Sequence, residues 1–124
     1  MNYKLRDTAK ESLIGQKSFA FALEIIDLYQ GLQTQNEFVL SKQLLRSGTS
    51  TGANVEEATA AQSRKDFLSK MSIASKEARE TKYWLRLISE SKITSINVQN
   101  ELNGIEEIIR ILTSIVKTTS QSLK

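Results

Sequence analysis

The segment RSGTSTGAN, residues 46–54, decides how the fold is read, because its composition suggests a loop while its surroundings suggest a helix. It contains Gly48, Gly52 and several small polar residues. Each glycine inside a helix costs about 1 kcal/mol relative to alanine, and serine and threonine are also weak helix formers. Three interpretations follow: a ligand-binding loop, a break between two helices, or the interior of one helix that needs small residues.

The glycine spacing argues against a ligand-binding loop. A phosphate-binding P-loop follows a strand and places Lys-Ser or Lys-Thr directly after its last glycine. Here Ala53 and Asn54 follow Gly52, and no strand pattern precedes the segment. The three-glycine spacing of a dinucleotide-binding fingerprint is also absent.

Helical spacing continues through the segment and favours one long helix. A loop would normally reset this spacing, so we expect Gly48 and Gly52 on the core face, where they let a neighbouring helix approach closely. The predicted buried seam of this helix consists of Phe38, Ser41, Leu45, Gly48, Gly52, Val55 and Thr59.

The rest of the chain also has helical period, and no segment shows sustained strand alternation. Thr34 with Glu37, and Ser63 with Asp66, have the spacing of capping boxes at two helix starts. Short connections imply antiparallel neighbours. The sequence therefore predicts one all-α domain over residues 1–124, an antiparallel up-down-up-down four-helix bundle with helices at about 12–33, 36–62, 64–91 and 96–121.

The composition excludes most catalytic chemistry. The chain has no histidine and no cysteine, which removes the usual general base, the usual thiolate and the commonest metal ligands. Glu56 and Glu57 are adjacent, so they point to different sides of a helix and do not form an acid–base pair. We therefore expect no catalytic residue, no metal and no cofactor.

The chain shows no membrane or export signal. No apolar run approaches the roughly 20 residues of a membrane span. The polar N-terminus, MNYKLRDTAKE, lacks the apolar segment of a signal peptide. We therefore expect a soluble, cytoplasmic protein with no membrane partner.

Two off-core stripes suggest a subunit interface, although a solvated surface is the simpler alternative. A tryptophan beside aliphatic and acidic residues is unusual for a solvated helix face, and Trp and Arg are enriched at interface hot spots. One attractive arrangement pairs Arg46 with Glu77 or Glu80 across a subunit boundary. The stripes are Arg46, Ser50, Asn54 and Glu57 on the second helix, and Ile73, Glu77, Glu80 and Trp84 on the third.

The last helix also points to a homo-oligomer. Ile108, Ile111 and Ile115 lie beside its expected core stripe and widen its apolar arc. A helix apolar over so wide an arc buries more than one face. A monomeric bundle would leave part of this arc in water.

A third stripe, on the helix predicted at 64–91, is basic. Cations interleaved with an aromatic residue suit phosphate contacts and base stacking, so we expect structured RNA or another nucleic acid as a partner. The net charge of +3 is mild, and the alternatives are an ordinary solvated face or a protein-interaction scaffold with no nucleic-acid role. The expected nucleic-acid-binding residues are Lys65, Lys76, Arg79, Lys82, Tyr83 and Arg86.

The stretch FVLSKQLLRSGTSTGANVEEATAAQSRKDFLSKMSIASKEARETKYWLRLI, residues 38–88, resembles the 23S rRNA intervening-sequence family of four-helix-bundle proteins. KSFAFALEIIDLY and EIIRILTSIVKT, residues 17–29 and 107–118, resemble it too. The resemblance implies four antiparallel helices assembled as a homopentamer. It also implies kinship with the accessory variability determinant of diversity-generating retroelements, a basic pentamer that engages nucleic acid and a reverse transcriptase.

The resemblance also assigns positions and shows two departures. The family's arginine, serine, asparagine and glutamate of the second helix match Arg46, Ser50, Asn54 and Glu57, and its acidic positions in the third match Glu77 and Glu80. Thr51 stands where relatives usually have isoleucine, a small change within the seam. The weaker positive charge makes tight nucleic-acid binding less expected than in the retroelement proteins.

Overall fold

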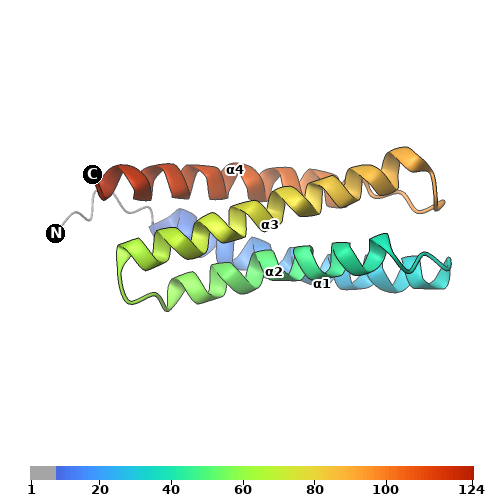
Figure 1. Ribbon diagram of the computed structural model, residues 1–124, viewed down its shortest axis with the longest axis horizontal. Helices are drawn as coiled ribbons and strands as arrows, with labels where there is room; N and C mark the ends of the chain where they lie inside the picture. The colour runs from blue at the N-terminus through green and yellow to red at the C-terminus, as the bar shows by residue number, and fades with distance from the viewer. Residues whose placement is uncertain (1–7) are drawn as a thin grey trace.

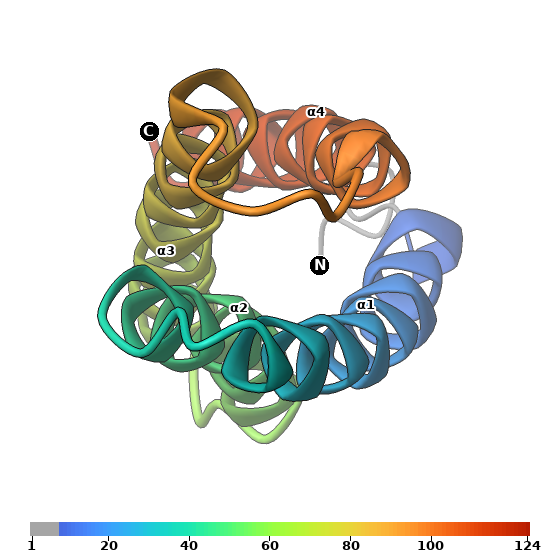
Figure 2. The ribbon, with the colours of Figure 1, turned by 90° about the vertical axis from the view of Figure 1, so that its right-hand side faces the viewer.

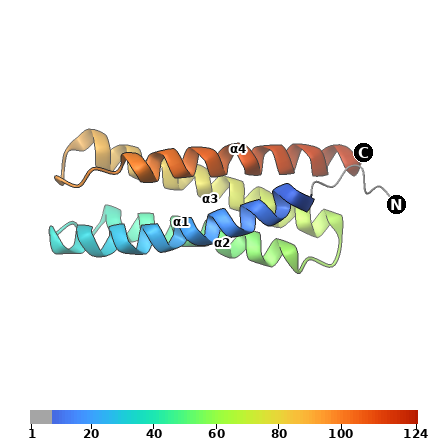
Figure 3. The same cartoon turned by 180° about the vertical axis from the view of Figure 1, so that it is seen from behind.

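The structure, a computed structural model, describes residues 8–124 and contains four helices in this part of the chain. Consecutive helices run in opposite directions, and their connections alternate between the two ends of the molecule (Figures 1 and 3). The predicted all-α, antiparallel four-helix bundle is therefore confirmed. Residues 1–7, which begin the polar N-terminal stretch, lie outside the described residues. The helices are α1 (Thr8–Thr34), α2 (Leu40–Thr59), α3 (Arg64–Ser91) and α4 (Gln99–Ser122).

Each helix packs against two neighbours. α1 contacts α2 and α4, and α3 also contacts α2 and α4. Seen along the bundle, α1 and α3 therefore lie on opposite sides (Figure 2). Their outward faces look away from each other.

The core runs along the bundle axis and receives side chains from all four helices. Burial of these aliphatic groups is the main stabilising contribution of the fold, at roughly 25 cal/mol per Å² of apolar surface. Large side chains less than 2% exposed include Ile14, Ile25, Leu32, Leu44, Met71, Leu85, Ile88, Ile105 and Leu112.

α2 continues without a break through the glycine-containing segment 46–54. Gly48 is buried, and a Cβ atom placed on it would lie 3.0 Å from Cγ2 of Ile25. A Cβ atom on Gly52 would lie 3.2 Å from the backbone carbonyl oxygen of Ser18. Both glycines thus let α1 pack closely against α2, and the continuous helical spacing correctly indicated a helix interior.

The buried seam of α2 differs from the predicted one. Phe38 is 46% exposed because it lies in the connection before α2, and Thr59 is exposed at the last turn. Leu45 and Gly52 are only half-buried. The true seam, with Ser47 set aside, alternates steps of three and four residues. Its buried residues are Ser41, Leu44, Ser47, Gly48, Thr51, Val55 and Ala58.

The capping box predicted at Thr34 and Glu37 is wrong. α1 continues to Thr34, whose hydroxyl donates to the carbonyl of Gln30 at 3.0 Å. Glu37 instead caps α2 alone. Its carboxylate accepts hydrogen bonds from the backbone N–H groups of Leu40 at 2.9 Å and Ser41 at 2.7 Å, and from that of Val39 at 3.2 Å.

The other predicted cap is present. The Ser63 hydroxyl accepts a hydrogen bond from the backbone N–H of Asp66 at 3.0 Å, and α3 begins at the next residue, Arg64. A side-chain oxygen that satisfies one of the first unpaired N–H groups is the usual way in which a helix start is stabilised.

Candidate functional site

The basic stripe lies on the outward side of α3, but two of its cations are already paired. Lys82 pairs with Glu106 of α4 at 3.5 Å, and Arg86 pairs with Glu90 of its own helix at 3.3 Å. Arg79 donates to the hydroxyl of Thr113 at 3.3 Å, which leaves its charge uncompensated.

The remaining residues of the stripe face solvent. Lys65 and Lys76 are exposed and form no ion pair within residues 8–124. Tyr83 is 54% exposed and stands edge-on to Trp84, with ring centroids 5.2 Å apart. The local positive charge is therefore smaller than the sequence suggests, and it is concentrated on Lys65, Lys76 and Arg79.

The two stripes expected at an interface meet along the α2–α3 seam. Arg46 of α2 bonds to Glu77 of α3 at 3.1 Å and also to Glu80. The indole N–H of Trp84 donates to the same Glu80 carboxylate at 2.9 Å. Further along the seam, Lys70 pairs with Glu57 at 3.0 Å.

This geometry corrects the expectation that Arg46 meets Glu77 or Glu80 of a neighbouring subunit. The pair forms within one chain, because α2 and α3 are adjacent and antiparallel. Asn54 is also satisfied locally, since its amide donates to the carbonyl and the hydroxyl of Ser50 at 2.9 and 3.2 Å. Of the predicted interface residues, Ile73 keeps an exposed apolar side chain, at 39%.

The expectation that a single chain leaves part of the apolar arc of α4 exposed to water is also wrong. Ile108 and Ile115 are only 2% and 3% exposed, and Ile111 is half-buried. α4 packs against both α1 and α3, so one chain covers the wide arc by itself. The argument for an oligomer from this helix therefore fails.

The structure instead exposes an apolar groove between α1 and α2, which the sequence pattern did not predict. Phe19, Leu23 and Ile26 of α1 are 69%, 52% and 38% exposed along it. The groove has a volume of about 510 Å³ and contains one charged residue, Glu56. The available signal was the circumference of α1, where apolar residues occupy the outward side as well as the core side.

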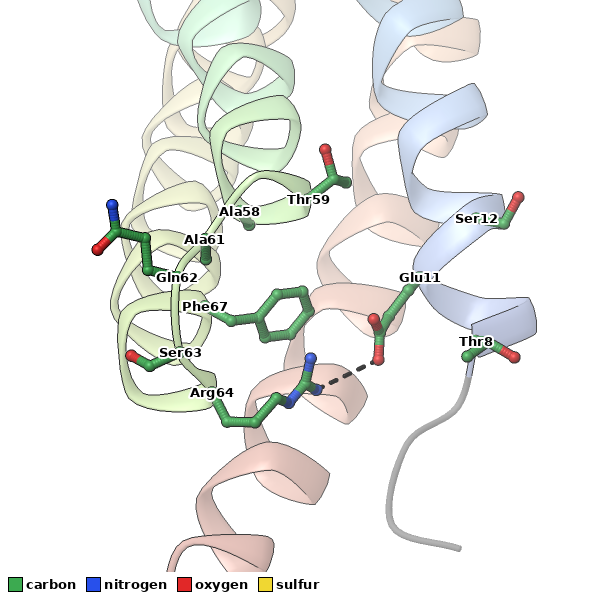
Figure 4. Close-up of a pocket in the computed structure, with 10 residues that line it drawn as sticks. All are labelled: Thr8, Glu11, Ser12, Ala58, Thr59, Ala61, Gln62, Ser63, Arg64 and Phe67. Carbon is green, nitrogen blue, oxygen red and sulfur yellow. Dashed lines mark hydrogen bonds and ion pairs between the residues drawn. The ribbon is translucent and has the colours of Figure 1, made fainter. Parts of the chain in front are cut away.

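A second cleft lies at the end of the bundle where α2 connects to α3 (Figure 4). The Arg64 guanidinium bonds to Glu11 at 3.3 Å and stacks over the ring of Phe67, 4.0 Å from its centroid. The cleft presents hydroxyl and amide groups beside this paired cation. Its arrangement stabilises the junction of α1 and α3 and offers no nucleophile–base pair.

The described part of the chain shows no metal or membrane feature. Across residues 8–124, no group of three or more Asp or Glu side chains is placed to hold a metal ion. None of the helices in this range is both long and apolar enough to cross a membrane.

The model of the 23S rRNA-intervening sequence protein family matches residues 10–114, which is most of the chain. The protein belongs to this family. No curated protein matches the chain.

A solved structure extends the relationship of this 23S rRNA-intervening sequence family member to three dimensions. It is a protein of unknown function from the S23 ribosomal protein family of Bacteroides thetaiotaomicron, 49% identical in sequence, with a TM-score of 0.82. The alignment covers 87% of this chain and 98% of that one. The resemblance read from the sequence is confirmed at the level of family and fold.

One ionisable group of this family member is poorly satisfied. Glu101, in the first turn of α4, has a buried carboxylate oxygen, Oε1, with no hydrogen-bond partner among the described residues. Burial raises the pKa of Glu101, and repulsion from Glu24 on α1 raises it further. Folding therefore favours the protonated form of this side chain.

We expect Glu101→Gln to stabilise the protein at neutral pH. Because the pKa is raised on folding, wild-type stability is fully present at low pH and falls as the pH rises through this raised pKa. The gain for Gln is at most about 1 kcal/mol, since solvent reaches part of the side chain. Urea unfolding at several pH values measures it, and an equal loss of stability at all pH values would contradict this assignment.

Proposed function

We propose that this protein is a non-catalytic, homo-oligomeric scaffold of the cytoplasm. The observation that carries the proposal is the exposed apolar surface of α1, where Phe19, Leu23 and Ile26 flank a groove. Contiguous large apolar side chains on a folded surface mark contacts with other macromolecules. The homopentamer implied by the family resemblance supports another copy of the chain as the partner.

The residue chemistry supports a non-catalytic role. The chain has neither histidine nor cysteine. Nucleophilic catalysis generally requires an activated side chain within reach of a base. The polar groups gathered at the α2–α3 seam are already paired with one another, and the Arg64 cleft holds a closed ion pair.

RNA binding through α3 is a second candidate. Lys65, Lys76 and Arg79 are exposed on one helix, and Tyr83 beside them offers a ring for stacking. The family description names an intervening sequence of 23S rRNA, which makes that RNA the natural first ligand to test. This candidate ranks second because Lys82 and Arg86 are paired with glutamates.

The molecular mass in solution tests both candidates. We expect light scattering after size-exclusion chromatography to give a discrete multiple of the 13.9 kDa chain, unchanged by nuclease treatment. A monomer at micromolar concentration would overturn the scaffold proposal. A mass that falls after nuclease treatment, together with RNA binding that weakens steeply with salt, would favour the RNA candidate.

A further inference from the structure

The outward surface of α1 combines apolar and acidic side chains. We define the α1 face as Phe19, Leu23, Ile26, Asp27 and Glu56, the last from the α2 side of the groove. Asp27 and Glu56 are exposed and form no ion pair within residues 8–124. The α1 face is therefore apolar and negatively charged.

The opposite side of the bundle has the complementary character. We define the α3 face as Ile73, Lys76, Arg79 and Tyr83, all of which are exposed. Ile73 and Tyr83 supply apolar area at 39% and 54% exposure. Lys76 and Arg79 supply positive charge that no acidic side chain within residues 8–124 neutralises.

We propose that the α1 face of one copy binds the α3 face of the next copy, so that the chain assembles head to tail. This inference rests on the proposed homo-oligomeric function and names the two surfaces that build it. Opposite charges on the two faces favour this pairing and disfavour α1 against α1 or α3 against α3, where like charges would meet.

The shape of the groove suits a helix. Its lining includes small residues, among them Gly15, Ala22, Gly52 and Ala53, together with the larger Phe19 and Leu23. On α3, the positions 73, 76, 79 and 83 repeat at steps of three and four, so Ile73 and Tyr83 share one side of the helix. They lie about 15 Å apart along it, a span that lets both contact the groove.

The opposed positions of the two faces fix the kind of assembly. α1 and α3 lie on opposite sides of the bundle (Figure 2) and meet only at one end, through the Arg64–Glu11 pair, among the contacts of residues 8–124. A contact between two different surfaces leaves one of each free on every pair, so copies continue to add until a ring closes or a filament forms. This contact therefore does not produce a closed twofold dimer.

RNA would account for only one of the two faces. Its phosphates suit Lys76 and Arg79 of the α3 face, but the acidic and apolar α1 face on the opposite side of the bundle has no role in phosphate binding. A second copy of the chain covers both faces with one interaction.

Charge exchange between the faces tests the proposal. One variant carries Asp27→Lys and Glu56→Lys, a second carries Lys76→Glu and Arg79→Glu, and a third carries all four changes. Each of the first two variants places like charges at every contact between copies. We therefore expect the protein concentration at which the oligomer dissociates to rise at least tenfold at about 0.1 M salt. The third restores opposite charges, and we expect it to regain the wild-type mass.

A matched control reverses two cations elsewhere. Arg110→Glu with Lys117→Glu changes the net charge as the second variant does, but on exposed positions of α4, and should keep the wild-type mass. Circular dichroism verifies that every variant is folded.

Several outcomes would overturn the inference while leaving the oligomeric function intact. They are a stable wild-type dimer, wild-type mass in both single-face variants, or failure of the four-residue variant to reassemble while it remains folded. An α3 variant that loses nuclease-sensitive material, with the α1 variant unaffected, would assign the α3 face to RNA. A monomeric wild type, by contrast, would contradict the proposed function itself.

Discussion

Replacing Gly48 with leucine is expected to destabilise the bundle by about 3 kcal/mol, the largest effect that we predict for one substitution. A Cβ atom at this position would lie 3.0 Å from Cγ2 and 3.1 Å from Cγ1 of Ile25, which is fully buried. Neither helix can yield without disturbing the close α1–α2 contact. The free energy of urea unfolding measures the effect.

Two further variants make this prediction specific. Gly15→Ala is the matched control, because no atom lies within 4 Å of an added Cβ there, and alanine should stabilise α1 by up to about 1 kcal/mol. Ile25→Ala combined with Gly48→Leu should cost less than the sum of the two changes, since the partner of the clash is removed. An unfolding midpoint for Gly48→Leu equal to that of the wild type would show that α1 and α2 are not packed this closely.

Replacing Glu37 with alanine is expected to lower the free energy of unfolding by about 2 kcal/mol at neutral pH. This is at the upper end of the effects measured when a helix N-cap is removed. Glu37 is only 6% exposed, and its carboxylate accepts bonds from three successive backbone N–H groups. Burial on its own would raise the pKa of Glu37, but the hydrogen bonds from Leu40, Ser41 and Val39 together outweigh it and lower the pKa.

The sign of the pH dependence provides a second readout for Glu37. Because the pKa is lowered on folding, the stabilisation is present above the ordinary glutamate pKa and is lost as the pH falls through the lower, folded-state value. Wild type and Glu37→Ala should therefore converge in stability in acid. Glu90→Ala, which breaks an exposed pair with Arg86, should cost less than about 0.5 kcal/mol. A Glu37→Ala deficit that stays constant with pH would mean that the charge is not what stabilises α2.

The helical period was enough to predict the bundle, because apolar spacing reports directly which face of a helix is covered. It also identified the interior position of Gly48, where the spacing continued through residues that are individually poor helix formers. The start of α2 was less predictable. Thr34 and Glu37 fit a capping box by spacing, but the hydroxyl bonds back into α1 and leaves the carboxylate to cap α2 alone.

Surface chemistry was harder to predict than the core. A sequence places Arg46, Glu77 and Glu80 on complementary stripes, but the same charges attract each other within a chain and between chains. Only the adjacency of α2 and α3 decides that the pair is internal. Likewise, the apolar width of α4 and that of α1 look alike in sequence. α1 and α3 cover Ile108 and Ile115, whereas nothing in the described chain covers Phe19.

The two glycine contacts constrain the two helices unequally when the sequence changes. At residue 48 the neighbour is the side chain of Ile25, so a larger residue on α2 can be exchanged for a smaller one on α1. At residue 52 the neighbour is the main-chain carbonyl of residue 18, which every amino acid possesses. No substitution at residue 18 makes room there, so a side chain at residue 52 would need a small shift of the α1 backbone. The outward positions of α1 face no backbone of a neighbouring helix, so the packing of the bundle does not limit the size of their side chains.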